Sequence, residues 1–212
     1  MEKTQKKISQ FISIIFHPLL IPSYTLLIIF NSGTFYSFIP FHTQRVFYVL
    51  IALTTFVIPI SIMPFLLNLK IVSGFMLQER KDRIIPLLIT SISYFFTLYL
   101  LSRLPFHVPE FINNYIFASA LLIFITLIIS MKWKISAHAI GIGGLLGSII
   151  IFSVAYYANL VYLISLIAII SGLIAYARLY LQEHKPFQIY SGFILGFFGM
   201  ITMIYLSFIF QT

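Results

Sequence analysis

The sequence contains no cysteine, which excludes disulfide bonds, thiolate-bound metal ions and a cysteine nucleophile. Charge is also scarce, because only 8% of the 212 residues are Asp, Glu, Lys or Arg. Five residues are acidic, and they do not form the paired motifs that hold magnesium. This disfavours metal-dependent prenyl transfer and polymer synthesis, and no His-Glu-x-x-His or similar spacing predicts a zinc site. We therefore expect neither a metal site nor another cofactor.

The sequence is instead rich in long apolar runs, with 60% hydrophobic residues and a mean hydropathy of +1.04. Soluble domains lie far below that value, so a bilayer is the expected solvent. The apolar runs lack the period of two that a membrane barrel needs, and they predict helices. Seven runs reach the length of about 20 residues that a span requires, at residues 8–31, 46–69, 84–104, 111–131, 138–158, 160–181 and 188–210.

The predicted fold is an all-α integral membrane protein, a polytopic bundle of six to seven transmembrane helices in one membrane-embedded domain over residues 1–212. The break near Asn159 is thin, so the spans on either side of it could also form one merged or tilted hairpin. The basic N-terminus resembles the start of a signal peptide. The apolar run that follows is too long for one, and a retained first helix is expected.

Positive charge is distributed unevenly between the two sides of the predicted bundle. Eleven of the 13 Lys and Arg residues share one side, and only Arg45 and Arg103 lie on the other. The eleven are Lys3, Lys6, Lys7, Lys70, Arg80, Lys81, Arg83, Lys132, Lys134, Arg178 and Lys185. The positive-inside rule predicts a cytoplasmic N-terminus, in a multi-pass protein of a bacterial-type inner (cytoplasmic) membrane. Membrane lipids rather than nucleic acid are the expected partners, since no folded basic face remains.

Three polar clusters interrupt the apolar pattern, and each is a candidate site because ionisable groups in a membrane cost free energy. The first cluster is QERKDRIIP, residues 78–86, where Arg80 and Arg83 would share a helix face beside Lys81. Guanidinium groups at a helix N-terminus favour the binding of an anion. The alternative is a cytoplasmic loop whose basic residues only follow the positive-inside rule.

The second cluster is KISAH, residues 134–138, at the start of the fifth predicted span. Ser136 is expected to cap that helix, with His138 in its first turn. The run GIGGLLG follows at residues 141–147, inside an apolar span and without a preceding strand. It predicts a small-residue face for close helix packing rather than a nucleotide-binding loop.

The third cluster is ARLYLQEHKPFQ, residues 177–188. Arg178 ends the sixth span, His184 lies in the short connection, and Pro186 starts the last span with Gln188 on an early turn. Snorkelling toward water would explain the arginine but not a histidine on the same side. Two spans separate consecutive clusters, which predicts all three on one face of the membrane.

Another histidine lies inside the first predicted span. His17 begins HPLLIPSY, and Pro18 and Pro22 are expected to kink the helix there. A neutral buried histidine paired to a neighbour is the ordinary interpretation. A residue that lines a substrate cavity is the alternative.

Together these clusters resemble the type 2 phosphatidic acid phosphatase superfamily, membrane phosphatases that work without a metal ion. The family pattern has three blocks, Lys-x6-Arg-Pro, Pro-Ser-Gly-His and Ser-Arg-x5-His-x3-Asp. Arg178, His184 and Gln188 match the third block in spacing, and Ser136 and His138 match the second. The first block is the poorest match, because Arg83 precedes Pro86 by three residues and Met76 stands where the family has lysine.

The resemblance implies a phosphatase-like core over residues 78–210, with residues 1–77 forming two additional N-terminal transmembrane helices. It implies that His184 attacks phosphorus and carries a phosphohistidine, while His138 protonates the leaving alkoxide. The implied substrate is a phosphorylated membrane lipid or a polyprenyl phosphate or diphosphate. The implied phosphate ligands are Arg178, Arg83, Arg80, Lys81 and Ser136.

Gln188 is the most consequential departure from the family pattern, which has aspartate there. A carboxylate both orients a catalytic imidazole and stabilises its cation, whereas an amide only orients it. Three functions therefore stay open: an active lipid-phosphate phosphatase, a catalytically impaired relative that binds or translocates phosphorylated lipids, and a structural subunit without a ligand.

Overall fold

The computed structural model describes residues 2–75, 77 and 79–210, and every regular element in this part of the chain is helical. In that part, seven helical segments are long and apolar enough to cross a membrane. They are Lys3–Phe30, Phe41–Asn68, Lys81–Ser102, Glu110–Ser130, Ala137–Ala155, Val161–Tyr180 and Pro186–Ile209. Each predicted span corresponds to one of these segments, so the prediction of an all-α polytopic membrane protein is confirmed. The fifth and sixth spans are separate helices rather than a merged hairpin.

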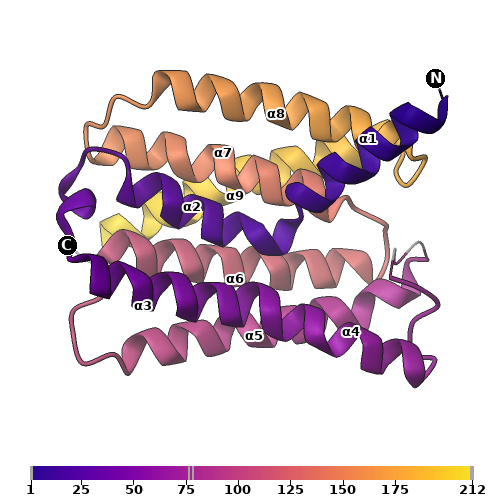
Figure 1. Ribbon diagram of the computed structural model, residues 1–212, viewed down its shortest axis with the longest axis horizontal. Helices are drawn as coiled ribbons and strands as arrows, with labels where there is room; N and C mark the ends of the chain where they lie inside the picture. Colours follow the sequence, from indigo (N-terminus) through magenta and orange to yellow (C-terminus); the bar gives the residue numbers. More distant parts are fainter. Residues whose placement is uncertain (1, 76, 78, 211–212) are drawn as a thin grey trace. The chain divides into compact units, whose positions relative to one another are not determined.

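The chain forms two compact units (Figure 1). The first unit, Met1–Ile39 with Ile135–Thr212, contains α1 (Glu2–Ile15), η1 (Pro18–Leu20), α2 (Ile21–Phe30), η2 (Phe35–Phe38), α7 (Ala137–Ala155), α8 (Val161–Tyr180) and α9 (Pro186–Phe210). The second unit, Pro40–Lys134, contains α3 (Phe41–Ala52), η3 (Leu53–Val57), α4 (Ile58–Asn68), η4 (Lys81–Arg83), α5 (Ile84–Ser102) and α6 (Glu110–Ser130). The expectation that both belong to one membrane-embedded domain stays a prediction.

The first span is not one continuous helix. α1 ends at Ile15, and the N–H of His17 donates to the carbonyl of Ile14 at 3.3 Å in a tighter turn. Pro18 then opens the 3-10 helix η1 and has no N–H to give to the preceding turn. The hydroxyl of Tyr24 donates to the carbonyl of Ile15 at 2.7 Å. The predicted kink is confirmed, and it leaves carbonyls at the end of α1 to side-chain donors.

Hydroxyl groups hold the second unit together around an irregular turn. The second span changes from α3 to α4 through the π-helix η3, Leu53–Val57. The Thr97 hydroxyl of α5 donates to the Thr54 hydroxyl at 2.8 Å, and the Ser93 hydroxyl donates to the Thr54 carbonyl. In lipid the polar groups of such a turn need protein partners, which α5 supplies.

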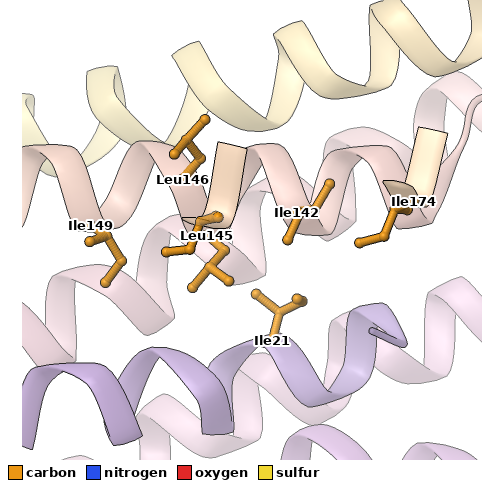
Figure 2. Close-up of a cluster of buried hydrophobic side chains, with 7 residues drawn as sticks. Ile21, Ile142, Leu145, Leu146, Ile149 and Ile174 are labelled. Carbon is orange, nitrogen blue, oxygen red and sulfur yellow. The ribbon is translucent and has the colours of Figure 1, made fainter. Parts of the chain in front are cut away.

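An aliphatic cluster joins α2, α7 and α8 in the first unit (Figure 2). It is built from Ile21, Ile142, Leu145, Leu146, Ile149, Ile167 and Ile174. Because lipid tails are as apolar as these side chains, helix association here depends on close packing rather than on removal of apolar surface from water. The fit between these side chains therefore sets how α2, α7 and α8 pack against one another.

Glycines allow α7 and α9 to approach each other closely. A Cβ atom on Gly143 or Gly147 of α7 would lie 2.4 or 2.5 Å from a carbonyl oxygen of α9. A Cβ on Gly192 of α9 would lie 2.9 Å from the carbonyl oxygen of Ser136, the N-cap of α7, and a Cβ on Gly196 would lie even closer to the carbonyl oxygen of Ile140 in α7. The predicted small-residue packing face is confirmed, and α9 contributes a matching pair with the same spacing of four.

Replacing Gly196 with alanine is expected to destabilise the protein by about 1–3 kcal/mol, because the new methyl group meets backbone rather than a side chain that can move. Gly172→Ala on α8 is the matched control, since no atom lies within 4 Å of its Cβ position. That control should be neutral or slightly stabilising, because alanine favours a helix more than glycine. Equal thermal unfolding of the two variants in detergent would contradict the close approach.

Candidate functional site

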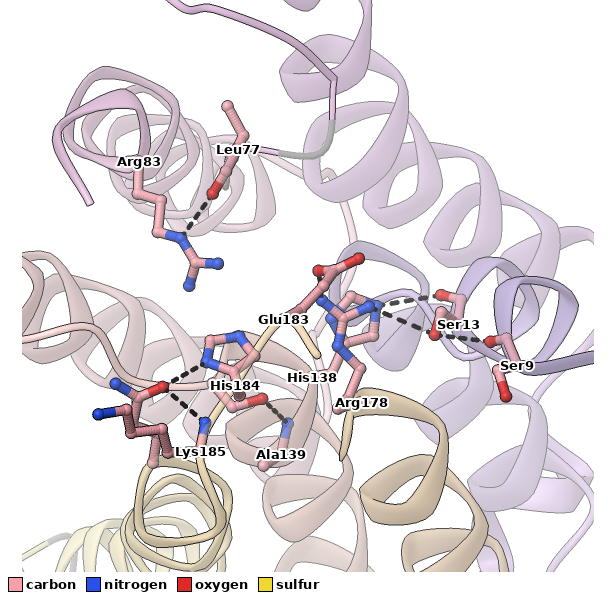
Figure 3. Close-up of polar contacts among 12 residues, drawn as sticks. Ser9, Ser13, Leu77, Arg83, His138, Ala139, Arg178, Glu183, His184 and Lys185 are labelled. Carbon is pink, nitrogen blue, oxygen red and sulfur yellow. Dashed lines mark hydrogen bonds and ion pairs between the residues drawn. The ribbon is translucent and has the colours of Figure 1, made fainter. Parts of the chain in front are cut away.

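His184 and Gln188 meet at the start of α9. His184 lies in the connection after α8 and is 7% exposed. Its Nδ1 lies 3.2 Å from Oε1 of Gln188, four residues later (Figure 3). The same Oε1 accepts a hydrogen bond from the backbone N–H of Lys185 at 3.1 Å. Gln188 therefore reaches back from the first turn of α9 as in a capping box, and it holds the histidine in the same position.

These contacts determine where the proton of His184 lies. The backbone N–H of Lys185 can only donate, so the Gln188 atom that faces it is the amide oxygen. An amide oxygen can only accept, so the contact to His184 requires a proton on Nδ1. In the neutral ring the lone pair then belongs to Nε2.

Arg178 is buried at the end of α8, with 5% of its surface exposed. Its Nη2 forms an ion pair with the carboxylate of Glu183, and its Nη1 donates to the Ser13 hydroxyl at 3.3 Å. Within the described part of the chain, its buried Nε–H has no hydrogen-bond partner. The guanidinium therefore retains a donor that an additional oxygen atom could satisfy.

His138 lies in the first turn of α7, as predicted, and is half-buried. Its Nε2 lies 3.0 Å from the backbone carbonyl oxygen of Ser13 on α1. Its ring also contacts the ring of His17 edge-on, with 5.5 Å between the centroids. Ser13 thus contacts His138 through its carbonyl and Arg178 through its hydroxyl (Figure 3).

Ser136 joins the start of α7 to the start of α9. Its hydroxyl accepts from the backbone N–H of Ala139 at 3.4 Å, which confirms the predicted helix cap. Its own N–H donates to the carbonyl of Gln188 at 3.3 Å, and its carbonyl lies against Gly192. Ser136 is fully buried, so its observed role is to hold the two helix starts together.

The basic residues of the first cluster lie in the second unit. Arg80 donates to the carbonyl of Met131 at the end of α6, where a cation also suits the helix dipole. Nε of Arg83 donates to the Leu77 carbonyl at 2.9 Å, and Lys81 is exposed. Asp82 accepts from the backbone N–H and the hydroxyl of Ser73. Arg80 and Arg83 each have a backbone partner in this unit.

Of the residues predicted from sequence, the structure brings five together in the first unit: Ser136, His138, Arg178, His184 and Gln188. The approach of Arg80, Lys81 and Arg83 to these residues stays a prediction, and the Met76 position lies outside the described residues.

Sequence reasoning missed two residues, Ser13 and Glu183, as partners of Arg178. A signal for Ser13 was present, because Ser9, Ser13 and His17 are spaced by four and would form a polar stripe along one helix face. Ser9 and Ser13 are both buried, and the Ser13 hydroxyl donates to the Ser9 carbonyl at 2.9 Å. The sequence contained no comparable indication that Glu183 would pair with Arg178. Glu183 lies in a loop, and the loop conformation decides where its side chain points.

Across residues 2–75, 77 and 79–210, no group of three His, Asp or Glu side chains is arranged to hold a metal ion. The contacts described in the first unit are made by three imidazoles, one guanidinium with its carboxylate, and serine hydroxyls. In comparisons with known proteins, no family model, no curated protein and no solved structure matches this chain.

Proposed function

We propose that this polytopic membrane protein removes phosphate from a lipid or isoprenoid phosphate or diphosphate, with His184 as the nucleophile. The observation that carries the proposal is the pair of contacts on Gln188, which leave the lone pair of His184 on Nε2. A buried arginine with an unsatisfied donor in the same unit supports it. Phosphoryl transfer mainly requires positioning and cations around the phosphate oxygens, and the contacts of His184 and the charge of Arg178 would serve these two needs.

In the first step Nε2 of His184 attacks phosphorus, a nitrogen–phosphorus bond forms, and the bond to the leaving oxygen breaks. Nδ1 keeps its proton, which is hydrogen-bonded to Oε1 of Gln188, so the ring becomes a phosphorylated imidazolium. His138 gives a proton to the leaving alkoxide. Water then gives a proton to His138 and attacks phosphorus, the nitrogen–phosphorus bond breaks, inorganic phosphate leaves, and Nε2 recovers its lone pair.

Arg178 is the phosphate ligand that the first unit supplies. Its present partner, the Glu183 carboxylate, accepts a hydrogen bond from Nη2 through one oxygen atom. Nε is left without a hydrogen-bond partner among the described residues. A tetrahedral phosphate can give one oxygen to Nη2 and another to Nε, so it satisfies one more donor than the carboxylate does. Binding therefore exchanges Glu183 for phosphate. Arg83, Arg80 and Lys81 are the further ligands we propose.

A second function is favoured by Gln188 itself, namely the binding or translocation of a phosphorylated lipid without its hydrolysis. The amide orients His184 but carries no charge to stabilise the imidazolium that the attack produces. A protein of this kind would still exchange Glu183 for a lipid phosphate at Arg178. The two functions share the ligand and differ in whether phosphate is released.

The proposed setting is a bacterial-type inner membrane with a cytoplasmic N-terminus. Seven spans and the excess of Lys and Arg on one side support this orientation. The three polar clusters would then open to the cytoplasmic leaflet. The partners are phosphorylated lipids of that leaflet, and the chemistry involves no nucleic acid, metal or other cofactor.

Adding phosphatidate to the purified protein is expected to raise its unfolding temperature, because a ligand at 100 times its Kd stabilises a protein by about 2.7 kcal/mol. Glu183→Gln should lower the starting temperature but enlarge the shift, since the carboxylate no longer competes for Arg178. Thermal unfolding in detergent, with phosphatidate titrated against phosphatidylcholine, measures both effects.

The matched control is the double variant Arg178→Gln with Glu183→Gln, which removes both charges and so leaves no buried charge unpaired. It should fold and show no shift with phosphatidate. An undiminished shift in the double variant would remove Arg178 from the ligand site. Assay of released phosphate in the same samples separates the phosphatase from the non-hydrolysing lipid-binding protein.

A further inference from the structure

The break in the first span gives one backbone carbonyl to the candidate site. In a continuous helix the N–H of His17 would donate to the carbonyl of Ser13, four residues earlier. Here it donates to Ile14 instead, because the chain tightens before Pro18. The carbonyl of Ser13 is thereby released from the helix and needs another donor, since a membrane interior offers little water.

His138 supplies that donor from α7. Its Nε2 lies 3.0 Å from the Ser13 carbonyl oxygen, which can only accept, so Nε2 carries the proton. The lone pair of the neutral ring then lies on Nδ1. The two catalytic candidates are therefore held in opposite tautomers, since His184 carries its proton on Nδ1.

The same break also orients a second imidazole. Nδ1 of His17 accepts from the backbone N–H of Leu19 at 3.3 Å, so the His17 proton lies on Nε2. The His17 ring packs edge-on against His138 at an interplanar angle of 83°. The hydroxyl of Ser13, the residue whose carbonyl is released, accepts a hydrogen bond from Nη1 of Arg178. Ser13, beside the break, thus contacts one side chain from α7 and one from α8.

We propose that Ser13 is a positioning residue, whose carbonyl, released by the break at Pro18, makes Nδ1 the reactive nitrogen of His138. The inference rests on the proposed function for its chemical step. In that step the Nδ1–H bond of the His138 imidazolium breaks and an O–H bond forms on the leaving alkoxide. The ring returns to the neutral form and keeps its proton on Nε2 against the Ser13 carbonyl throughout.

Nitrogen NMR of the protein with ¹⁵N-labelled histidine in detergent tests the tautomer without any turnover. With His138→Gln to assign the signals, neutral wild-type His138 should show a protonated Nε2 and an unprotonated, downfield Nδ1. A neutral His138 with its proton on Nδ1 would overturn the proposal, whether or not the protein releases phosphate. The expected tautomer in a protein that releases no phosphate would uphold the positioning and reject the phosphatase.

Pro18→Ala tests the cause, because an alanine N–H there allows the helix to continue and His17 to donate to Ser13. The variant should convert the single tautomer of His138 into a mixture. Pro22→Ala is the matched control, since Pro22 lies within the first turn of α2 beyond the break. It should leave the His138 signals unchanged. An unchanged tautomer in a folded Pro18→Ala protein would show that the break is not its cause.

Discussion

Replacing His184 with alanine is expected to lower phosphate release from phosphatidate or a prenyl diphosphate by at least about 10³-fold, as removal of a nucleophile does. The reason is that the variant lacks Nε2 of His184, the atom that we propose attacks phosphorus. Gln188 orients the imidazole and Lys185 orients Gln188, so the alanine variant loses the attacking atom while α9 keeps its cap. Release of inorganic phosphate by the purified protein measures the effect.

His107→Ala is the matched control, because His107 is exposed in the connection after α5 and lies outside the three polar clusters. It should retain wild-type turnover. A wild type and a His184→Ala variant that release phosphate equally slowly would contradict the phosphatase function. The phosphatidate-induced thermal shift would then decide for or against lipid-phosphate binding.

Replacing Gln188 with glutamate is expected to raise the turnover number at least tenfold. Glutamate has the length of glutamine, so a carboxylate oxygen can take the position of Oε1, 3.2 Å from Nδ1 of His184. The added charge stabilises the imidazolium formed on attack, and the capping interaction with Lys185 persists. An upper limit of about 10⁴-fold follows from carboxylate-to-amide replacement in a serine protease triad.

Two controls separate this effect from the addition of negative charge alone. Gln182→Glu adds the same charge at an exposed position of the same connection and should not raise turnover. Gln188→Asp supplies a carboxylate one methylene too short for the observed contact, so its gain should be smaller. If Gln188→Glu leaves turnover unchanged, imidazolium stabilisation does not limit the reaction, and the non-hydrolysing function gains support.

Much of the local structure could be predicted from residues that act on their own helix. Ser136 caps α7 because a serine before an apolar run satisfies an N-terminal amide, and Pro186 starts α9 because it lacks an N–H. Pro18 ends the first half of the first span for the same reason. Gln188 lies in the first turn after Pro186, where a glutamine can reach back to the residues before the helix, and there it meets His184.

The partners of Arg178 could not be predicted in this way. Both Ser13 and Glu183 reach it, one from a helix 165 residues away and one from the adjoining loop. The spans are apolar around most of their circumference, so hydropathy carries little information about which face of a helix meets a neighbour. The glycine faces of α7 and α9 indicate where these two helices meet, but they do not indicate which residues α1 contacts.

By itself, the sequence determined the membrane environment, the helical class, the seven spans and the helix starts at Ser136 and Pro186. Apolar length and backbone hydrogen bonding leave a chain of this kind few alternatives in a bilayer. Only the tertiary structure decided that a break at Pro18 exposes the Ser13 carbonyl to His138, and that Arg178 pairs with Glu183. These contacts depend on the rotation and depth of each helix, which packing sets after the spans have formed.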